Sequence, residues 1–277
     1  MATRSSLRRA CCAAAVLSAA LSTGRAAWGA EPPLFRTSPW LDGAASAALW
    51  GTTLALQLGE ERLLDRPCGP ENPCRSDGIN ALDRIALGYW SGSTTCASCD
   101  VLMTTALLAG PLLEVGRAAD RSDWEGLGAY ILVYLQAVGL TSLTVKTLKL
   151  AVHRPMSFVY DFTPAEQGKL DLFDYQAFPS GHTAHAFAGA GVVTFAMARR
   201  YGGSPATWIA GGAAHAAALA TGLVKIGVGI HYPTDVLVGA LIGEAASLGV
   251  CWLHAVDAPV RPVAWAGPHG FGVGLQL

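Results

Sequence analysis

The chain has 277 residues, of which 52% are hydrophobic and only 14% are charged. Soluble domains usually carry about 25% charged residues, so this chain lacks the polar surface to cover a water-soluble globule of its size. The formal net charge is −1 and no Lys/Arg tract follows the first residues, which argues against a nucleic-acid partner.

The N-terminal residues 1–30 have the pattern of a targeting segment. Arginines at positions 4, 8 and 9 precede the apolar run Ala10–Leu21, and Ala27–Ala30 offers small residues suited to cleavage. This order predicts a secretory signal peptide. An uncleaved N-terminal anchor is the alternative.

Residues 31–100 are predicted to form an extracytoplasmic segment that contains cysteines and one packed helix. Cys68, Cys74, Cys96 and Cys99 lie in a polar part rich in Gly, Pro and Asn. A zinc site is conceivable from the Cys-x2-Cys spacing, but disulfides are expected behind an export signal. The sequence does not indicate which cysteines pair.

Apolar stretches long enough to form helices recur along the chain, and none alternates with the period of a strand. They are Gly43–Gly59, Val101–Leu113, Gly126–Val145, Tyr175–Ala198, Tyr201–Val224 and Val236–Val256. A membrane-spanning helix needs about 20 mostly apolar residues. We therefore predict an all-α fold, a membrane-associated bundle of about five to six apolar helices over residues 101–257, with a Gly/Pro-rich tail at 258–277.

Counting the crossings predicts where the ends of these helices lie. Two crossings separate the cysteines from Lys149, which returns the chain to the same side. The same count places His182 and His231 there as well, so the active site is expected at one end of the bundle, on the extracytoplasmic face. Arg199 and Arg200 fall on the opposite side, as the positive-inside tendency expects. The first run, Gly43–Gly59, is then predicted to pack without crossing.

The first chemical motif is Pro179-Ser180-Gly181-His182-Thr183, directly before an apolar, helix-like run. Gly181 allows the backbone to approach a ligand closely, and the free N–H groups of a helix start bind anions. Ser180 adds a hydroxyl donor, and His182 can deliver a proton near neutral pH. An ordinary capped loop is the alternative.

The second motif is His231-Tyr232-Pro233-Thr234-Asp235. Pro233 suits the first position of a helix, which puts Asp235 in the first turn. From there its carboxylate can bond one ring nitrogen of His231 and leave the other as a nucleophile. A purely structural His–Asp cap is the alternative.

Basic residues complete the set. Lys149 and Arg154 lie at the end of the run from Gly126, and Lys225 precedes His231 by six residues. Such cations suit the oxygens of a phosphoryl group in transfer. They could instead mark the ends of helices where long basic side chains reach water. No Asp/Glu cluster has metal-ligand spacing, so neither a metal nor another cofactor is expected.

Together these motifs resemble the type 2 phosphatidic acid phosphatase superfamily, which also contains vanadium haloperoxidases and bacterial class A acid phosphatases. The pattern of that family is Lys-x6-Arg-Pro, then Pro-Ser-Gly-His, then Ser-Arg-x5-His-x3-Asp. The similarity covers about residues 125–255. The second motif is complete, and the His-x3-Asp of the third is intact at His231 and Asp235.

The resemblance implies a role for each matching residue. His231 is expected to be the nucleophile that forms a phosphohistidine, Asp235 to orient it, and His182 to protonate the leaving group. The residues expected to bind the phosphate are Lys149, Arg154, Ser180, Gly181 and Lys225.

Two positions depart from the family pattern. Counting from Lys149, the first arginine falls on Met156, and the Ser-Arg pair falls on Val224 and Lys225. Lysine keeps the charge but loses the bidentate fork of arginine, and methionine keeps neither. Arg154, two positions before Met156, is the candidate substitute. Losing one donor to the transition state can cost roughly 100- to 1000-fold in rate.

By this resemblance the chain is expected to be a metal-independent phosphatase acting on a lipid phosphate or pyrophosphate, such as phosphatidic acid or a polyprenyl pyrophosphate. A bacterial inner-membrane site facing the periplasm is expected, or else a periplasmic location. Two alternatives stay open: a weak or inactive relative that binds lipid phosphates or other membrane components, and a soluble periplasmic acid phosphatase. The sequence indicates neither the head group nor the oligomeric state.

Overall fold

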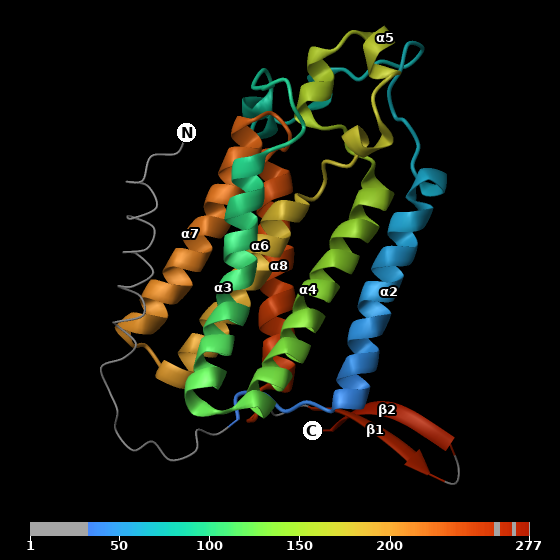
Figure 1. Ribbon diagram of the computed structural model, residues 1–277. Coiled ribbons are helices and arrows are strands. Elements are labelled where there is room, and N and C mark those ends of the chain that lie inside the picture. The colour runs from blue at the N-terminus through green and yellow to red at the C-terminus, as the bar shows by residue number, and fades with distance from the viewer. Residues whose placement is uncertain (1–32, 258–260, 268–269, 277) are drawn as a thin grey trace. The chain divides into compact units, whose positions relative to one another are not determined.

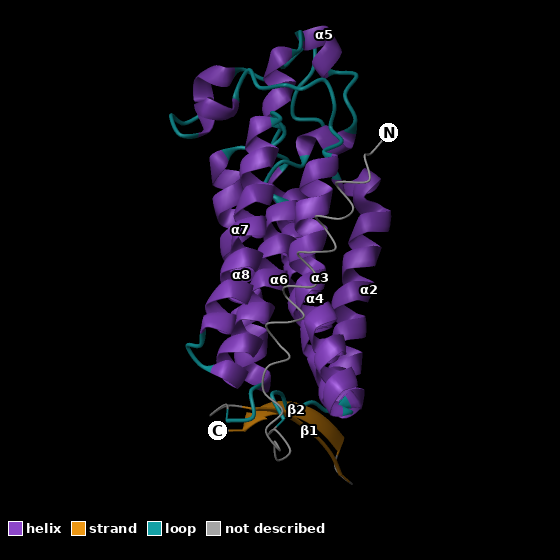
Figure 2. Cartoon of the chain, turned by 60° about the vertical axis from the view of Figure 1, so that its left-hand side comes forward, coloured by secondary structure: helices purple, strands orange, loops and turns teal. Residues whose placement is uncertain are grey.

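The computed structural model describes residues 33–257, 261–267 and 270–276. The expected signal segment, 1–30, lies outside these residues. The described chain folds into a helical bundle, which confirms the all-α prediction (Figures 1 and 2). Its long helices are α2 (Pro39–Leu63), α3 (Ala97–Arg121), α4 (Trp124–Val152), α6 (Gly181–Tyr201), α7 (Pro205–Gly227) and α8 (Pro233–His254).

Helix α6 lies at the centre of the bundle, in contact with α3, α4, α7 and α8. Small residues permit this close packing. A Cβ atom on Gly239 of α8 would lie 2.5 Å from the carbonyl oxygen of Ser180, and one on Gly243 would collide with the carbonyl of Ala184. The backbones of α6 and α8 therefore touch, and their N-terminal ends are held side by side.

Four helices among the described residues are long and apolar enough to cross a membrane: α3, α4, α7 and α8. They mark the chain as a membrane protein. The run Tyr175–Ala198 was expected to supply another crossing, but its helix begins only at Gly181 and is rich in Ala, Gly, Thr and His. Because α6 faces other helices, it does not need the apolar surface that lipid contact requires. Helix α2 also falls outside this group and packs against α4.

Helix α3 is longer than its apolar run suggested. It continues through Pro111 and ends at Arg121. Glu114, which interrupts the run, is buried, and its carboxylate pairs with Arg117 on the same helix and with Arg200 of α6. The charge is thus neutralised inside the bundle, where an isolated carboxylate would be costly.

One end of the bundle carries most of the irregular structure, where α4 ends and α6 and α8 begin (Figure 1). The disulfides Cys68–Cys74 and Cys96–Cys99 belong to the segments that cover it, as expected of an oxidised compartment. The short helices are η1 (Ser76–Gly78), η2 (Asp83–Ala86), η3 (Ser157–Asp161), α5 (Pro164–Gln167) and η4 (Leu172–Tyr175).

The C-terminal part was expected only to be a Gly/Pro-rich tail at 258–277. Its described residues form two antiparallel strands, β1 (Arg261–Gly267) and β2 (Gly270–Gln276). The hairpin lies outside the motifs and contributes no residue to the site described below.

Candidate active site

His231 and Asp235 form the pair that the second motif predicts. Pro233 begins α8, so Asp235 lies in its first turn, and its Oδ2 atom is 3.3 Å from Nδ1 of His231. The same oxygen accepts a hydrogen bond of 3.0 Å from the backbone N–H of Tyr232. Both side chains are almost fully buried. The carboxylate therefore holds the Nδ1–H form of the imidazole and leaves Nε2 without a proton.

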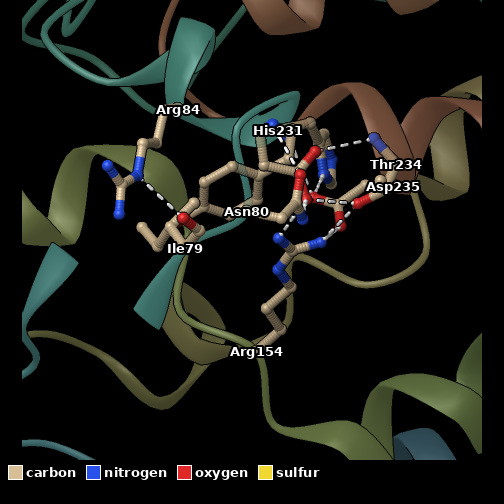
Figure 3. A network of polar contacts seen from close by, with 9 residues as sticks. Ile79, Asn80, Arg84, Arg154, His231, Thr234 and Asp235 are labelled. Atoms are coloured by element: carbon tan, nitrogen blue, oxygen red, sulfur yellow. Dashed lines mark hydrogen bonds and ion pairs between the residues drawn. The ribbon is translucent and has the colours of Figure 1, made fainter. Parts of the chain in front are cut away.

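Arg154 reaches the same carboxylate from the segment after α4. The backbone of His153 is left-handed, with φ of 48°, and this ends the helix and directs the chain toward α8. Nη1 of Arg154 lies 2.6 Å from Oδ1 of Asp235 and Nη2 lies 2.7 Å from Oδ2 of Asp83. The guanidinium is thus held between two carboxylates, and its contact with Asp235 can be seen in Figure 3. Its Cζ atom lies over the ring of Tyr232, 3.9 Å from the ring centroid.

Asp83, in η2, anchors this network from outside the motifs. It accepts hydrogen bonds from the backbone and hydroxyl of Thr234, at 3.0 and 2.7 Å, and from the amide of Asn80 at 2.7 Å. Burial raises the pKa of Asp83, but the hydrogen bonds from Arg154 and Thr234 outweigh it and hold the pKa below its ordinary value. The ionised carboxylate fixes Arg154 and the first turn of α8 together.

The first motif lies against this network at the start of α6. Ser180 is the N-cap residue and is fully buried, and its backbone N–H donates to the carbonyl of Asp235 at 3.0 Å. Gly181 is the first helical residue. A Cβ on Gly181 would lie 3.8 Å from Cε of Lys149, so the lysine side chain passes beside the helix start. The ammonium of Lys149 donates to the carbonyl of Gln176.

His182 and Lys225 lie on the remaining side. Lys225, in the last turn of α7, is 4% exposed, and its charge acts on both His182 and His231. Nε2 of His182 lies 2.8 Å from Oδ1 of Asp100, the fourth residue of α3. The structure therefore gathers all the predicted site residues at one end of the bundle, where α4, α6, α7 and α8 meet.

The environment of His231 suits a nucleophile. Burial lowers the pKa of its imidazole, the charges of Lys149 and Lys225 act in the same direction, and Asp235 opposes them. The net result is a pKa below the ordinary value of 6.5. The ring is therefore neutral at neutral pH, with the free electron pair on Nε2.

Met156, which falls on the family's arginine position by counting, does not face this site. Its side chain is 1% exposed and packs in the hydrophobic cluster that contains Phe158 and Tyr232. Arg154 lies at the site instead, and its guanidinium is engaged by carboxylates. The Arg-Pro pair of the chain thus comes two residues earlier, relative to Lys149, than the family pattern has it.

A cavity of about 480 Å³ opens beside this network. Arg154, Thr234 and Asp83 line it on the polar side, and Val152, Pro155 and Phe178 supply apolar surface. The residues that line it include Arg154 but neither His182 nor His231, so it lies on the Arg154 side of the network.

Sequence reasoning missed three polar residues of the site: Asp83, Asp100 and Thr234. Two of them contact the motifs across long separations, 71 residues from Asp83 to Arg154 and 82 from Asp100 to His182. No local pattern marks such contacts. Thr234 lies inside the second motif, as the second residue of α8. Its hydroxyl at a helix start was the feature of the sequence that could have indicated a role at the site.

Comparison with known proteins finds a family that is similar to part of the bundle. The family model described as the PAP2 superfamily matches residues 130–257. The match confirms the resemblance expected over about residues 125–255. The segments that supply Asp83 and Asp100 precede the matched residues.

A solved structure is also similar to this chain. It is the first transmembrane PAP2 type phosphatidylglycerolphosphate phosphatase from Bacillus subtilis, with 20% sequence identity and a TM-score of 0.40. The similarity covers 76% of this chain and 90% of that one. The likeness is too weak to inform the site. No curated protein matches the chain.

Proposed function

We propose that this protein is a metal-independent phosphatase that hydrolyses a lipid phosphate or pyrophosphate through a phosphohistidine on His231. The observation that carries the proposal is the buried chain of contacts from His231 to Asp235 and on to Arg154. It leaves Nε2 of a neutral imidazole as the nucleophile, at a place where the N-terminus of α6 and cations from α4 and α7 gather.

In the first step, Nε2 of His231 attacks phosphorus and the bond to the leaving oxygen breaks. His182 gives that oxygen a proton, from Nδ1 because Nε2 is engaged by Asp100. In the second step, His182 takes a proton from water, the hydroxide oxygen bonds to phosphorus, and the N–P bond breaks to release phosphate. Lys149, Lys225, Ser180 and the Gly181 N–H stabilise the charge on the phosphoryl oxygens.

A lipid substrate and a membrane location fit the composition of the bundle. The site lies at an end of helices long and apolar enough to cross a bilayer, where a lipid head group is found. Phosphatidic acid and polyprenyl pyrophosphates are the substrates proposed. The disulfides belong to the segments at this end, so the proposed location is a bacterial inner membrane with the site on the periplasmic face.

The test is phosphate release by the purified full-length protein in detergent from phosphatidic acid, a polyprenyl pyrophosphate and a short alkyl phosphate. The wild type should release phosphate from at least one of these, and His231→Ala should lower the rate on the order of 1000-fold or more. An acid-labile, alkali-stable phosphoenzyme should form only when His231 is present. Equal rates for the wild type and His231→Ala would refute the proposed mechanism.

The arginines of the family pattern favour a second candidate, a relative that binds lipid phosphates without hydrolysing them. Met156 lies in the core, Arg154 is already held by two carboxylates, and Lys225 stands where the family has its second arginine, so the site has one arginine fewer than the family pattern. Replacing Met156 by arginine would bury a charge and cannot serve as the test. Binding to phosphatidic acid vesicles without phosphate release from any compound would support this candidate.

A further inference from the structure

Asp100 is a charged residue at the site that none of the three motifs contains. Its Oδ1 atom lies 2.8 Å from Nε2 of His182, within hydrogen-bonding distance. The contact joins the first turn of α3 to the first turn of α6. Its side chain is 57% exposed, while that of His182 is 32% exposed. The carboxylate therefore reaches the imidazole from the solvent side.

The backbone around Asp100 is fixed. Cys96 caps α3, and its sulfur accepts a hydrogen bond from the N–H of Cys99. The N–H of Asp100 donates to the carbonyl of Cys96 at 3.0 Å. Cys99 is fully buried and forms a disulfide with Cys96. The carboxylate is consequently presented from a rigid helix start.

Asp100 opposes the other groups around His182 in their effect on the protonation of its ring. Burial lowers the pKa of His182 to about 4, the charge of Lys225 of α7 acts in the same direction, and the carboxylate of Asp100 of α3 opposes both. His231, before α8, faces His182 as a neutral ring at neutral pH. A hydrogen bond from Nε2–H to the Asp100 carboxylate leaves Nδ1 as the nitrogen available to a substrate. It also favours the protonated ring, which burial and Lys225 disfavour.

We propose that Asp100 is a positioning residue that orients His182 and stabilises its protonated form, so that His182 can protonate the leaving oxygen. This inference rests on the proposed phosphatase function. It assigns a reaction role to a segment that lies before the residues matched by the PAP2 family. The pairing resembles the one between Asp235 and His231, so each imidazole has its own carboxylate.

Leaving-group dependence separates this role from a purely structural one. An alkyl phosphate expels a poor leaving group and needs the proton, whereas p-nitrophenyl phosphate expels a stable phenolate and does not. Asp100→Asn should lower kcat for the alkyl phosphate about 10- to 100-fold. It should change the first-turnover release of p-nitrophenolate less than about 3-fold. The alkaline limb of the alkyl phosphate profile should move to lower pH.

Asp77→Asn is the matched control, because Asp77 is an exposed carboxylate in the same cysteine segment and pairs only locally with Arg75. It should leave both reactions unchanged. Asp100→Glu, which keeps the charge, should recover most of the alkyl phosphate rate. His182→Ala should show the same dependence on the leaving group as Asp100→Asn.

Two results would overturn the inference. One is an Asp100→Asn protein with wild-type rates and an unmoved alkaline limb. The other is an equal loss with both compounds, which would mean that the substitution damages the site as a whole. A wild-type protein inert on both compounds, on phosphatidic acid and on a polyprenyl pyrophosphate would instead refute the proposed phosphatase function, and the role of Asp100 with it.

Discussion

The tautomer of His231 follows from one contact and its surroundings. Oδ2 of Asp235 is 3.3 Å from Nδ1 and also accepts the N–H of Tyr232, while Oδ1 of the same carboxylate is held by Arg154. The carboxylate cannot rotate without breaking these bonds. It therefore accepts the Nδ1 proton in a fixed direction, which is how a carboxylate orients an imidazole for nucleophilic attack.

Replacing Asp235 by asparagine should lower kcat on the order of 100- to 10,000-fold, because the amide can hold the wrong tautomer of His231. The pH profile gives a second readout. Burial and nearby cations keep the pKa of His231 below 6.5, and Asp235 is the group that raises it. The rate should therefore rise with pH through a midpoint below 6.5 in the wild type. In Asp235→Asn that midpoint should be lower still.

Steady-state rates between pH 4 and pH 9 on one alkyl phosphate check both expectations, since the ionisation of the substrate is common to the two proteins. A midpoint that moves upward in Asp235→Asn would contradict the assignment. It would mean that the group in the acid limb is a carboxylate or the substrate rather than His231.

For individual residues, the sequence predicted which side chains belong to the motifs, but it did not predict their contacts with residues outside the motifs. The pairing of His231 with Asp235 was predictable because a first-turn carboxylate reaches back by four residues. The contact between Arg154 and Asp83 was not, since it depends on how a separate segment packs over the bundle end. Counting along the motif put the arginine on Met156, because the chain has two residues fewer between Lys149 and its Arg-Pro pair than the family pattern has.

At the scale of elements, the contact between α6 and α8 determines the site. Ser180 and His182 belong to the start of α6, and Asp235 belongs to the start of α8. The helices can approach because Gly239 and Gly243 present bare backbone to α6. A hydrogen bond from the Ser180 N–H to the Asp235 carbonyl then locks the two starts together.

Gly243→Ala should therefore separate the helices, since its methyl group would collide with the carbonyl of Ala184. We expect a loss of about 1–3 kcal/mol in stability from overpacking. Activity should fall as well, because the histidines come from the two separated elements. Gly249→Ala is the matched control in α8, because nothing lies within 4 Å of its added Cβ.

Alanine at position 249 should be neutral or stabilise the helix by up to about 1 kcal/mol. Thermal unfolding in detergent and phosphate release measure the two effects. Equal unfolding temperatures for the two alanine variants would show that the close approach of α6 and α8 does not limit stability.

Helix positions were largely predictable, and the exceptions have a physical cause. The run from Tyr175 was read as one helix, but its first residues form η4 and the loop that ends at Ser180. An apolar, uncharged run does not reveal where a helix begins when a turn motif lies inside it. The length of α3 was underestimated, because Pro111 and Glu114 interrupt the apolar run. The helix nevertheless continues through both residues, since the charge of Glu114 is paired inside the bundle.

At the scale of the whole molecule, the site and the disulfides belong to segments at the same end of the bundle, and the α6–α7 turn lies at the other (Figure 1). Arg199 and Arg200 lie in the last turn of α6, directly before it. Basic residues favour the cytoplasmic side, and disulfides form outside it. Both signals support the proposed orientation, in which the histidines face the oxidising compartment. A chain with four such apolar helices also argues against the soluble alternative.

Single cysteines can test this orientation in cells. Ala165 in α5 and Gly203 in the α6–α7 turn are both exposed, and they belong to opposite ends. We expect Ala165→Cys to react with a membrane-impermeant maleimide in spheroplasts, and Gly203→Cys to react only after the membrane is permeabilised. The parent chain, labelled in parallel, gives the background from its seven cysteines; of the five among the described residues, Cys251 is buried and four are paired.

The reverse labelling pattern would put the histidines in the cytoplasm, and the disulfides could then not persist there. Labelling of both variants in spheroplasts would mean that the chain does not cross the membrane between these positions. Extraction with alkaline carbonate separates the causes of that result, since a peripheral protein is released and an integrated bundle stays with the lipid. We expect the protein to stay in the membrane on carbonate extraction, and only Ala165→Cys to be labelled in spheroplasts. This outcome follows from the arrangement of charges, disulfides and apolar helices.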